Sequence, residues 1–216
     1  MRFLIITLFM LLAIEGCTSL DPKPTGSTGS LVTVVATAMN DPNAGTEWLP
    51  TGLLSVSFSA VRGAIFGSPT EEDLVRIPVL IGKDIALNFT ELEARIEPLA
   101  EPPSNPTFDG VAFDPPATRI ARVGTFFFSE TNLRYAAGAG FKDAATNDHL
   151  LLVYFDRSCS VRGTMGVQEQ SAEINISVPA AGLWWLRVTQ IDENRSKLTL
   201  LSGIENIVLV ARKPRM

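Results

Sequence analysis

Apolar and polar residues alternate along much of this chain, and this alternation limits the folds that it can adopt. In residues 55–61 the even positions are apolar through position 60, and their odd neighbours are serines up to position 59. Residues 173–178 and 197–200 repeat the pattern. Because successive side chains on a strand point to opposite faces of a sheet, each segment predicts a strand with one buried face. The chain is therefore expected to be all-β.

The C-terminal part of the chain predicts the most regular set of strands. Residues 150–155 and 207–211 are continuous apolar runs, which are typical of strands buried on both faces. Segments rich in Gly, Pro, Asn and Ser separate the predicted strands. Residues 150–212 thus predict five or six antiparallel strands, and we expect an antiparallel β-sandwich, immunoglobulin-like or related, over residues 31–216.

One short helix is expected near residues 69–74. Ser68 can cap its N-terminus, Pro69 suits the first helical position, and Glu71 supplies the carboxylate of a capping box. Residues 90–99 fit both a strand alternation and a helical spacing, and we interpret them as a strand.

Two segments are predicted to be loops. Residues 100–116 contain five prolines and form either a boundary between two small domains or a long connection within one sandwich. We favour one unit, because the strands before this segment are too few to close their own core. Residues 134–149 are small and polar, and they are expected to form a mobile loop that faces solvent.

Composition and charge exclude several classes of function. The net charge of -5 argues against a nucleic-acid partner, since an acidic surface repels phosphates. The chain has one histidine, so a metal site built from several histidines is excluded. Phosphate-binding loops, dinucleotide fingerprints and nucleophile elbows are absent from the sequence. We therefore expect no metal, no cofactor and no catalytic activity.

Two side chains could still carry nucleophilic chemistry. His149 stands beside Asp148 at the end of the second predicted loop, and we interpret it as a surface residue. An envelope hydrolase that uses His149 or an acidic pair is the least favoured alternative. Cys159 lies between the polar residues Ser158 and Ser160, so it belongs to the apolar face as a buried structural thiol.

Adjacent tryptophans at Trp184 and Trp185 supply the most informative local feature. On a strand these side chains point to opposite faces, so Trp184 belongs to the core and Trp185 falls with Arg187 on the other face. An exposed tryptophan beside an arginine is typical of an interface anchor, which makes Trp185 and Arg187 candidate interaction residues. The alternative is that the N-terminal segment or the proline-rich loop covers Trp185.

The first residues are organised as an export signal. Arg2 is followed by an apolar run over residues 3–14, which is too short to span a bilayer. Residues 14–17 (Ile-Glu-Gly-Cys) resemble the lipobox of bacterial lipoprotein precursors. The resemblance implies that signal peptidase II removes residues 1–16 and that Cys17 becomes the lipidated N-terminus. The alternative is ordinary cleavage that leaves Cys17 as a free thiol.

The lipobox resemblance also implies a location. Residues 17–30 are rich in Pro, Gly, Ser and Thr, as expected of a flexible tether between a lipid and a folded domain. Thr18 and Ser19 follow the cysteine where an Asp would mark retention in the inner membrane. We therefore expect a protein of the bacterial cell envelope, anchored in the outer membrane and facing the periplasm.

The sequence as a whole favours a non-catalytic interaction or assembly module at the membrane surface, with another envelope protein as its partner. The alternative is a binding protein for a small molecule, lipid or glycan. A ligand-binding protein predicts a closed apolar cavity, whereas an interaction module predicts a packed core and an exposed aromatic patch.

Overall fold

A computed structural model describes residues 30–35, 54–66, 73–80, 83–104, 108–129, 134–167, 170–201 and 207–212. The signal peptide, Cys17, most of the tether and residues 69–72 of the predicted helix lie outside these ranges. Within the described residues, no helix has the length and apolar character needed to cross a membrane.

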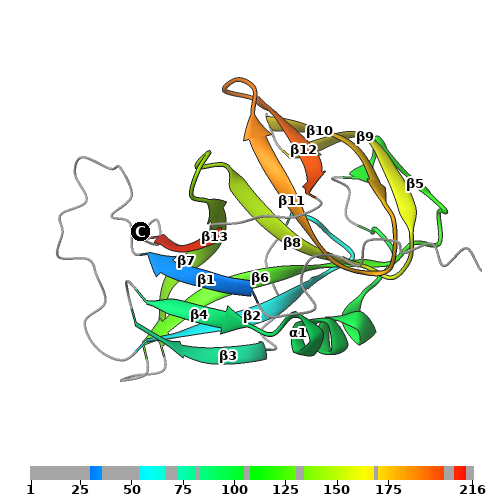
Figure 1. Cartoon of the computed structure of the whole chain (residues 1–216). Coiled ribbons are helices and arrows are strands. Elements are labelled where there is room, and N and C mark those ends of the chain that lie inside the picture. The colour runs from blue at the N-terminus through cyan, green and yellow to red at the C-terminus, as the bar shows by residue number, and fades with distance from the viewer. Residues whose placement is uncertain are drawn as a thin grey trace, which may run out of the picture.

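The described residues form an all-β, sandwich-like fold, which confirms the fold class predicted from the alternation (Figure 1). The strands are β1 (Ser30–Val35), β2 (Leu54–Arg62), β3 (Asp73–Val79), β4 (Asp84–Leu87), β5 (Val111–Asp114), β6 (Ile120–Ser129), β7 (Arg134–Asp143), β8 (His149–Phe155), β9 (Cys159–Val167), β10 (Gln170–Val178), β11 (Gly182–Gln190), β12 (Arg195–Leu201) and β13 (Ile207–Arg212). They pair in the order β4-β1-β13-β7-β6-β8-β11-β12-β10-β9-β5, and β2 joins β6 to β3. The β1–β13 and β10–β12 pairs are parallel, so the expectation of a purely antiparallel sheet is wrong at these two places.

The sheet folds around two hydrophobic cores, and β8 and β11 form a wall between them. Alternate residues of these paired strands face opposite sides. The first core takes Leu152, Tyr154, Leu183 and Trp185, and the second takes Val153, Phe155, Trp184 and Leu186. This two-sided burial confirms the interpretation of residues 150–155. In Figure 1, β9 to β12 and β5 curve into one half of the sheet, while α1 lies beside β3 in the other half.

Helix α1 (Phe89–Ile96) lies where the sequence analysis expected a strand, so that prediction is wrong. The side chain of Asn88 caps the helix by accepting a hydrogen bond from the Glu91 N–H at 3.1 Å. The helix places Phe89, Leu92 and Ile96 in the first core, because residues at this spacing share one helical face. A short 3-10 turn, η2 (Glu97–Leu99), follows it.

Three other local predictions need correction. The helix expected near residues 69–74 does not include its last two positions, since Asp73 and Leu74 belong to β3. The first predicted loop contains β5, and the second contains β7. Strand β7 forms despite its glycines and alanines because β6 and β13 hold its backbone on both sides.

Candidate functional site

Trp185 is buried, so the prediction that it is an exposed interface anchor is wrong. Only 6% of its surface is accessible. Its ring forms T-shaped contacts with Phe141 on β7 at a centroid distance of 5.0 Å and with Phe89 on α1 at 6.1 Å. The cover of Trp185 therefore comes from α1, in the N-terminal half of the chain, and from β7.

Arg187 is held in an ion pair rather than presented to a partner. Its Nη2 lies 2.5 Å from Oδ2 of Asp143, and its Nε lies 3.7 Å from Oδ2 of Asp148. Its side chain is 28% exposed, and that of Asp143 only 5%. Burial by itself raises the pKa of Asp143, but hydrogen bonds from the Ala145 and Thr146 N–H groups and the charge of Arg187 outweigh it and hold the pKa below its ordinary value. Trp185 and Arg187 thus both make contacts within the fold: Trp185 packs against aromatic rings, and Arg187 pairs with Asp143.

The structure also separates the two residues that could carry nucleophilic chemistry. His149 begins β8 and Cys159 follows its far end, so roughly 20 Å of strand lies between them. Burial raises the pKa of the Cys159 thiol to about 11, although a hydrogen bond with Thr118 lowers it somewhat. A protonated, buried thiol without the histidine beside it is not a nucleophile. Among the described residues, no group of three or more His, Cys, Asp or Glu side chains could hold a metal ion.

An open groove lies beside β5, at one end of the sheet. It has a volume of about 610 Å³. Two of its lining rings, Phe108 and Phe113, are in edge-to-face contact with their centroids 5.5 Å apart. Phe108 belongs to the second core, whereas Phe113 is half-buried. The lining consists of Pro103, Ser104, Phe108, Asp109, Val111, Ala112, Phe113 and Pro116. Aromatic surface beside carboxylate and hydroxyl groups suits binding.

Among the described residues, β5 pairs only with β9, so its other edge is open. The Thr164 N–H of β9 donates to the Gly110 carbonyl at 3.1 Å, just before β5 begins. Because backbone groups alternate in direction along an antiparallel strand, Ala112 also turns its N–H and C=O towards β9. Val111 and Phe113 then direct theirs away from β9, towards the open edge.

Gly163 fixes the position of β5 against β9. It has a φ of 140°, which L side chains rarely adopt. A Cβ at this position would lie 1.9 Å from the Gly110 carbonyl oxygen and 2.8 Å from Cα of Val111. Only glycine permits β5 to approach β9 this closely. Gly163 therefore fixes the position of β5, which forms one wall of the groove.

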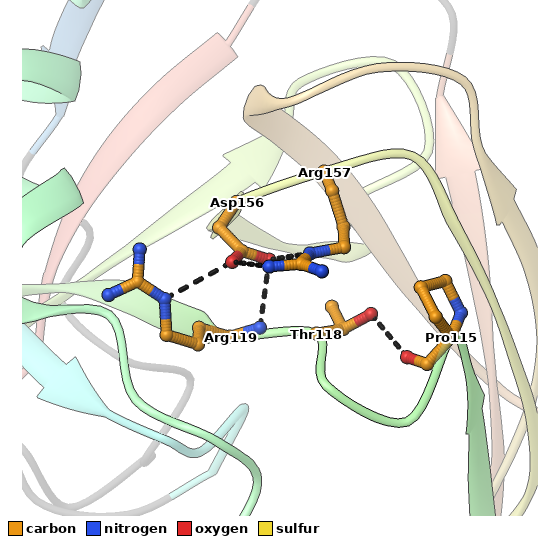
Figure 2. Close-up of polar contacts among 5 residues, drawn as sticks. All are labelled: Pro115, Thr118, Arg119, Asp156 and Arg157. Atoms are coloured by element: carbon orange, nitrogen blue, oxygen red, sulfur yellow. Dashed lines mark hydrogen bonds and ion pairs between the residues drawn. The ribbon is translucent and has the colours of Figure 1, made fainter.

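A clamp centred on Asp156 holds the turn that carries Pro116 (Figure 2). One Asp156 oxygen accepts from the backbone N–H of Arg119 at 2.9 Å and from Nε of Arg157 at 3.1 Å. The other accepts from Nε of Arg119 at 3.1 Å and from Nη2 of Arg157 at 2.9 Å. Within the turn, the Thr118 hydroxyl donates to the Pro115 carbonyl at 2.6 Å. Pro116 is therefore held from both sides.

The negative charge of the Asp156 carboxylate is also stabilised. The Asp156 side chain is only 5% exposed, and burial alone raises its pKa. The hydrogen bonds from Arg157 and Arg119 and the charge of Arg157 reverse this effect, so the pKa lies below its ordinary value. Asp156 is a structural carboxylate, and it acts on the groove only by positioning the turn.

Backbone hydrogen bonds fix the opposite wall of the groove. The Ser104 N–H donates to the Gly63 carbonyl at 3.3 Å, and Gly63 in turn donates to the Ile120 carbonyl at 3.0 Å. Glu101 and Ile120 exchange a further pair of bonds at 2.8 and 3.1 Å. Hydrogen bonds to the sheet thus hold the segment that carries Ser104, and the Asp156 clamp holds the turn that carries Pro116. The groove lies between these two segments.

The sequence does not predict this groove, because the prolines of residues 100–116 indicate a loop. A local signal was present: Val111 and Phe113 alternate with Ala112 and Asp114, directly after Gly110. Four residues form a short strand, and the five surrounding prolines obscured it.

Comparisons with known proteins add no further constraint. No protein-family model matches the chain, and no similar protein was found among curated sequences or solved structures. The site therefore has to be interpreted from its own geometry.

Proposed function

We propose that this chain is a lipid-anchored protein of the bacterial cell envelope, and that it acts as a non-catalytic interaction module through the β5 groove. One observation carries the proposal: the half-buried Phe113 and its partner Phe108 stand in an open groove beside an open strand edge. The groove replaces the Trp185–Arg187 face as the contact, because that face is engaged within the protein. Anchored walls support binding without a large ordering cost.

The chemistry of the groove supports binding rather than catalysis. Asp109 and Ser104 are its polar lining residues and both are exposed, whereas the remaining lining is apolar or proline. The buried thiol of Cys159 belongs to the second core and is not among the groove residues. Its described residues therefore offer a partner a concave shape, aromatic surface and hydrogen-bonding groups.

The membrane half of the proposal rests on residues 14–17, and Cys17→Ala tests it. Without the acylated cysteine, the protein should move from the membrane fraction to the soluble fraction, while its circular dichroism spectrum remains that of a folded β-protein. Retention of the alanine variant in the membrane would contradict lipid anchoring.

A photo-crosslinking residue placed at position 112 tests the groove in intact cells. Ala112 is exposed on β5, so the replacement should not disturb the core. The matched control carries the same residue at Glu193, which is exposed in the turn between β11 and β12. A specific envelope protein captured from position 112 but not from 193 supports the proposal. Equal capture from both positions, or from neither, would contradict it.

A further inference from the structure

We infer that the open edge of β5 binds an extended, lysine- or arginine-bearing segment of a partner protein as an added β-strand. This inference rests on the proposed function, because it specifies the chemistry of the partner at the same groove. The backbone of the partner would pair with β5, and its side chains would meet the groove and the charges beside it.

Backbone groups at the open edge support strand addition. Val111 and Phe113 direct their N–H and C=O groups away from β9, and the described residues supply no strand on that side. An exposed strand edge of this kind pairs readily with another extended chain. Gly163 and the Asp156 clamp hold the edge in place before any partner arrives.

The groove gives an added strand a place for alternate side chains. Every second side chain of an extended segment points to one face. One set would face Phe108 and Phe113, whose rings line the groove. An apolar side chain fits there, since the half-buried Phe113 ring would lose contact with water.

The charges beside β5 favour a basic partner. Asp109 precedes the strand, Asp114 ends it, and both are exposed. Arg162 lies opposite Ala112 on β9 and offsets part of this charge, whereas Arg119 and Arg157 are engaged with Asp156. The three carboxylates and three guanidinium groups sum to zero, but the charges are separated: Asp109 and Asp114 flank β5 itself, whereas the guanidinium groups belong to β9 and to the pair around Asp156. The edge strand therefore carries carboxylates at both ends, and the chain as a whole has a net charge of -5. Lysine or arginine in the partner is therefore attracted, and an acidic segment is repelled.

Two synthetic hexapeptides of opposite charge provide the first test. We would measure fluorescence anisotropy of labelled KVKVKV and EVEVEV with the folded Cys17→Ala protein. The lysine peptide should bind at least tenfold more tightly, and its affinity should fall with added salt. Asp109→Asn and Asp114→Asn should each reduce the difference between the peptides. Equal binding of the two peptides, or no binding of either, would overturn the inference.

Proline at position 111 tests the backbone pairing. Val111→Pro removes an outward N–H and leaves the Ala112 bonds to β9 intact. It should weaken binding of KVKVKV at least tenfold, whereas the control Val111→Ala should change it less than threefold. Circular dichroism and thermal melting establish that both variants are folded. If the folded proline variant binds as the wild type does, the partner does not add to this edge.

Methylation of the peptide backbone makes the same test without changing the protein. Only alternate N–H groups of an added strand face β5. KVKVKV methylated at the valine nitrogens and KVKVKV methylated at the lysine nitrogens should therefore differ at least tenfold in affinity. Equal affinities would overturn strand addition.

The crosslinking experiment separates this inference from the proposed function. If position 112 captures an envelope protein but neither hexapeptide binds, the inference is wrong and the proposed function stands. Capture of a polysaccharide would also overturn the inference, since the partner would then be a glycan.

Discussion

Nη2 of Arg187 lies 2.5 Å from Oδ2 of Asp143, and this ion pair ties β11 to the end of β7. The same Asp143 side chain accepts hydrogen bonds from the N–H groups of Ala145 at 2.8 Å and Thr146 at 3.4 Å. One buried carboxylate therefore organises the turn between β7 and β8 and also fixes the neighbouring strand. Arg187, which the sequence analysis predicted to contact a partner, is instead paired within the fold with Asp143 and Asp148.

Replacing Arg187 should destabilise the protein. Arg187→Ala leaves the buried carboxylate of Asp143 without its charged partner, and we expect a loss of about 1.5–3 kcal/mol in the free energy of unfolding. Urea denaturation measures this loss. The control is Arg195→Ala, because Arg195 pairs with Asp192 in an exposed turn, and it should cost no more than about 1 kcal/mol. Equal effects of the two variants would contradict a structural role for Arg187.

Trp185→Ala should be one of the most damaging single changes in the first core. Removal of the ring leaves a cavity beside Phe89 and Phe141, for which we expect a cost of about 3–5 kcal/mol. Ile191→Ala is a suitable control, since Ile191 is 53% exposed and its truncation should change stability by less than about 0.5 kcal/mol. Denaturation curves that coincide for the two variants would show that the Trp185 ring is not buried.

The alternation of side chains predicted the β-rich fold well, because burial of one sheet face leaves a direct mark on the sequence. It also separated Trp184 from Trp185 correctly. The residues that cover Trp185 could not be predicted. They are Phe89 of α1 and Phe141 of β7, which are distant from Trp185 in the sequence. Solvent exposure is a property of the tertiary structure, and local periodicity leaves it open.

The local errors have a related physical cause. Residues 90–99 satisfied two periodicities, and the Asn88 cap together with the first core selected the helix. Strand β7 is rich in glycine and alanine, so its own propensity is weak, and pairing with β6 and β13 determined its structure. The failure to predict the groove has a different cause: β5 leaves a four-residue alternation in the sequence, but the surrounding prolines obscure it, and its close approach to Gly163 of β9 is a tertiary contact.

Acid should weaken the clamp that holds the groove. Because the pKa of Asp156 is lower in the folded protein than in the unfolded chain, its contribution to stability is full above the ordinary value of about 3.9. It is lost as the pH falls through the lower folded value. Asp156→Asn should therefore be less stable at pH 7 and should lose less stability than the wild type between about pH 5 and pH 2. Urea denaturation across this range measures both effects, and an unchanged acid dependence would contradict the assignment.

Gly163→Ala should displace β5 from β9. Alanine has no favourable conformation at a φ of 140°, and its Cβ would meet the Gly110 carbonyl, so we expect a cost of at least about 1 kcal/mol. Amide hydrogen exchange at β5 should accelerate, because its bonds to β9 would break. Gly166→Ala on the same strand is the matched control, since a Cβ there meets no atom within 4 Å, and it should have little effect. Equal behaviour of the two alanine variants would contradict the role of Gly163.

Cys159 should resist alkylation in the folded protein. With a pKa of about 11, about one thiol in a thousand is ionised at pH 8, compared with about a quarter for an ordinary cysteine. Cys17→Ala removes the only other cysteine, so iodoacetamide then reports on Cys159 alone. Mass spectrometry should show labelling on the order of a hundredfold slower in the native protein than in denaturant. Thr118→Val removes the hydrogen bond that lowers the pKa of Cys159, so this variant should label no faster than the wild type if it remains folded. Native labelling as fast as that of the unfolded chain would mean that the thiol is ionised and accessible, and it would reopen nucleophilic chemistry at Cys159.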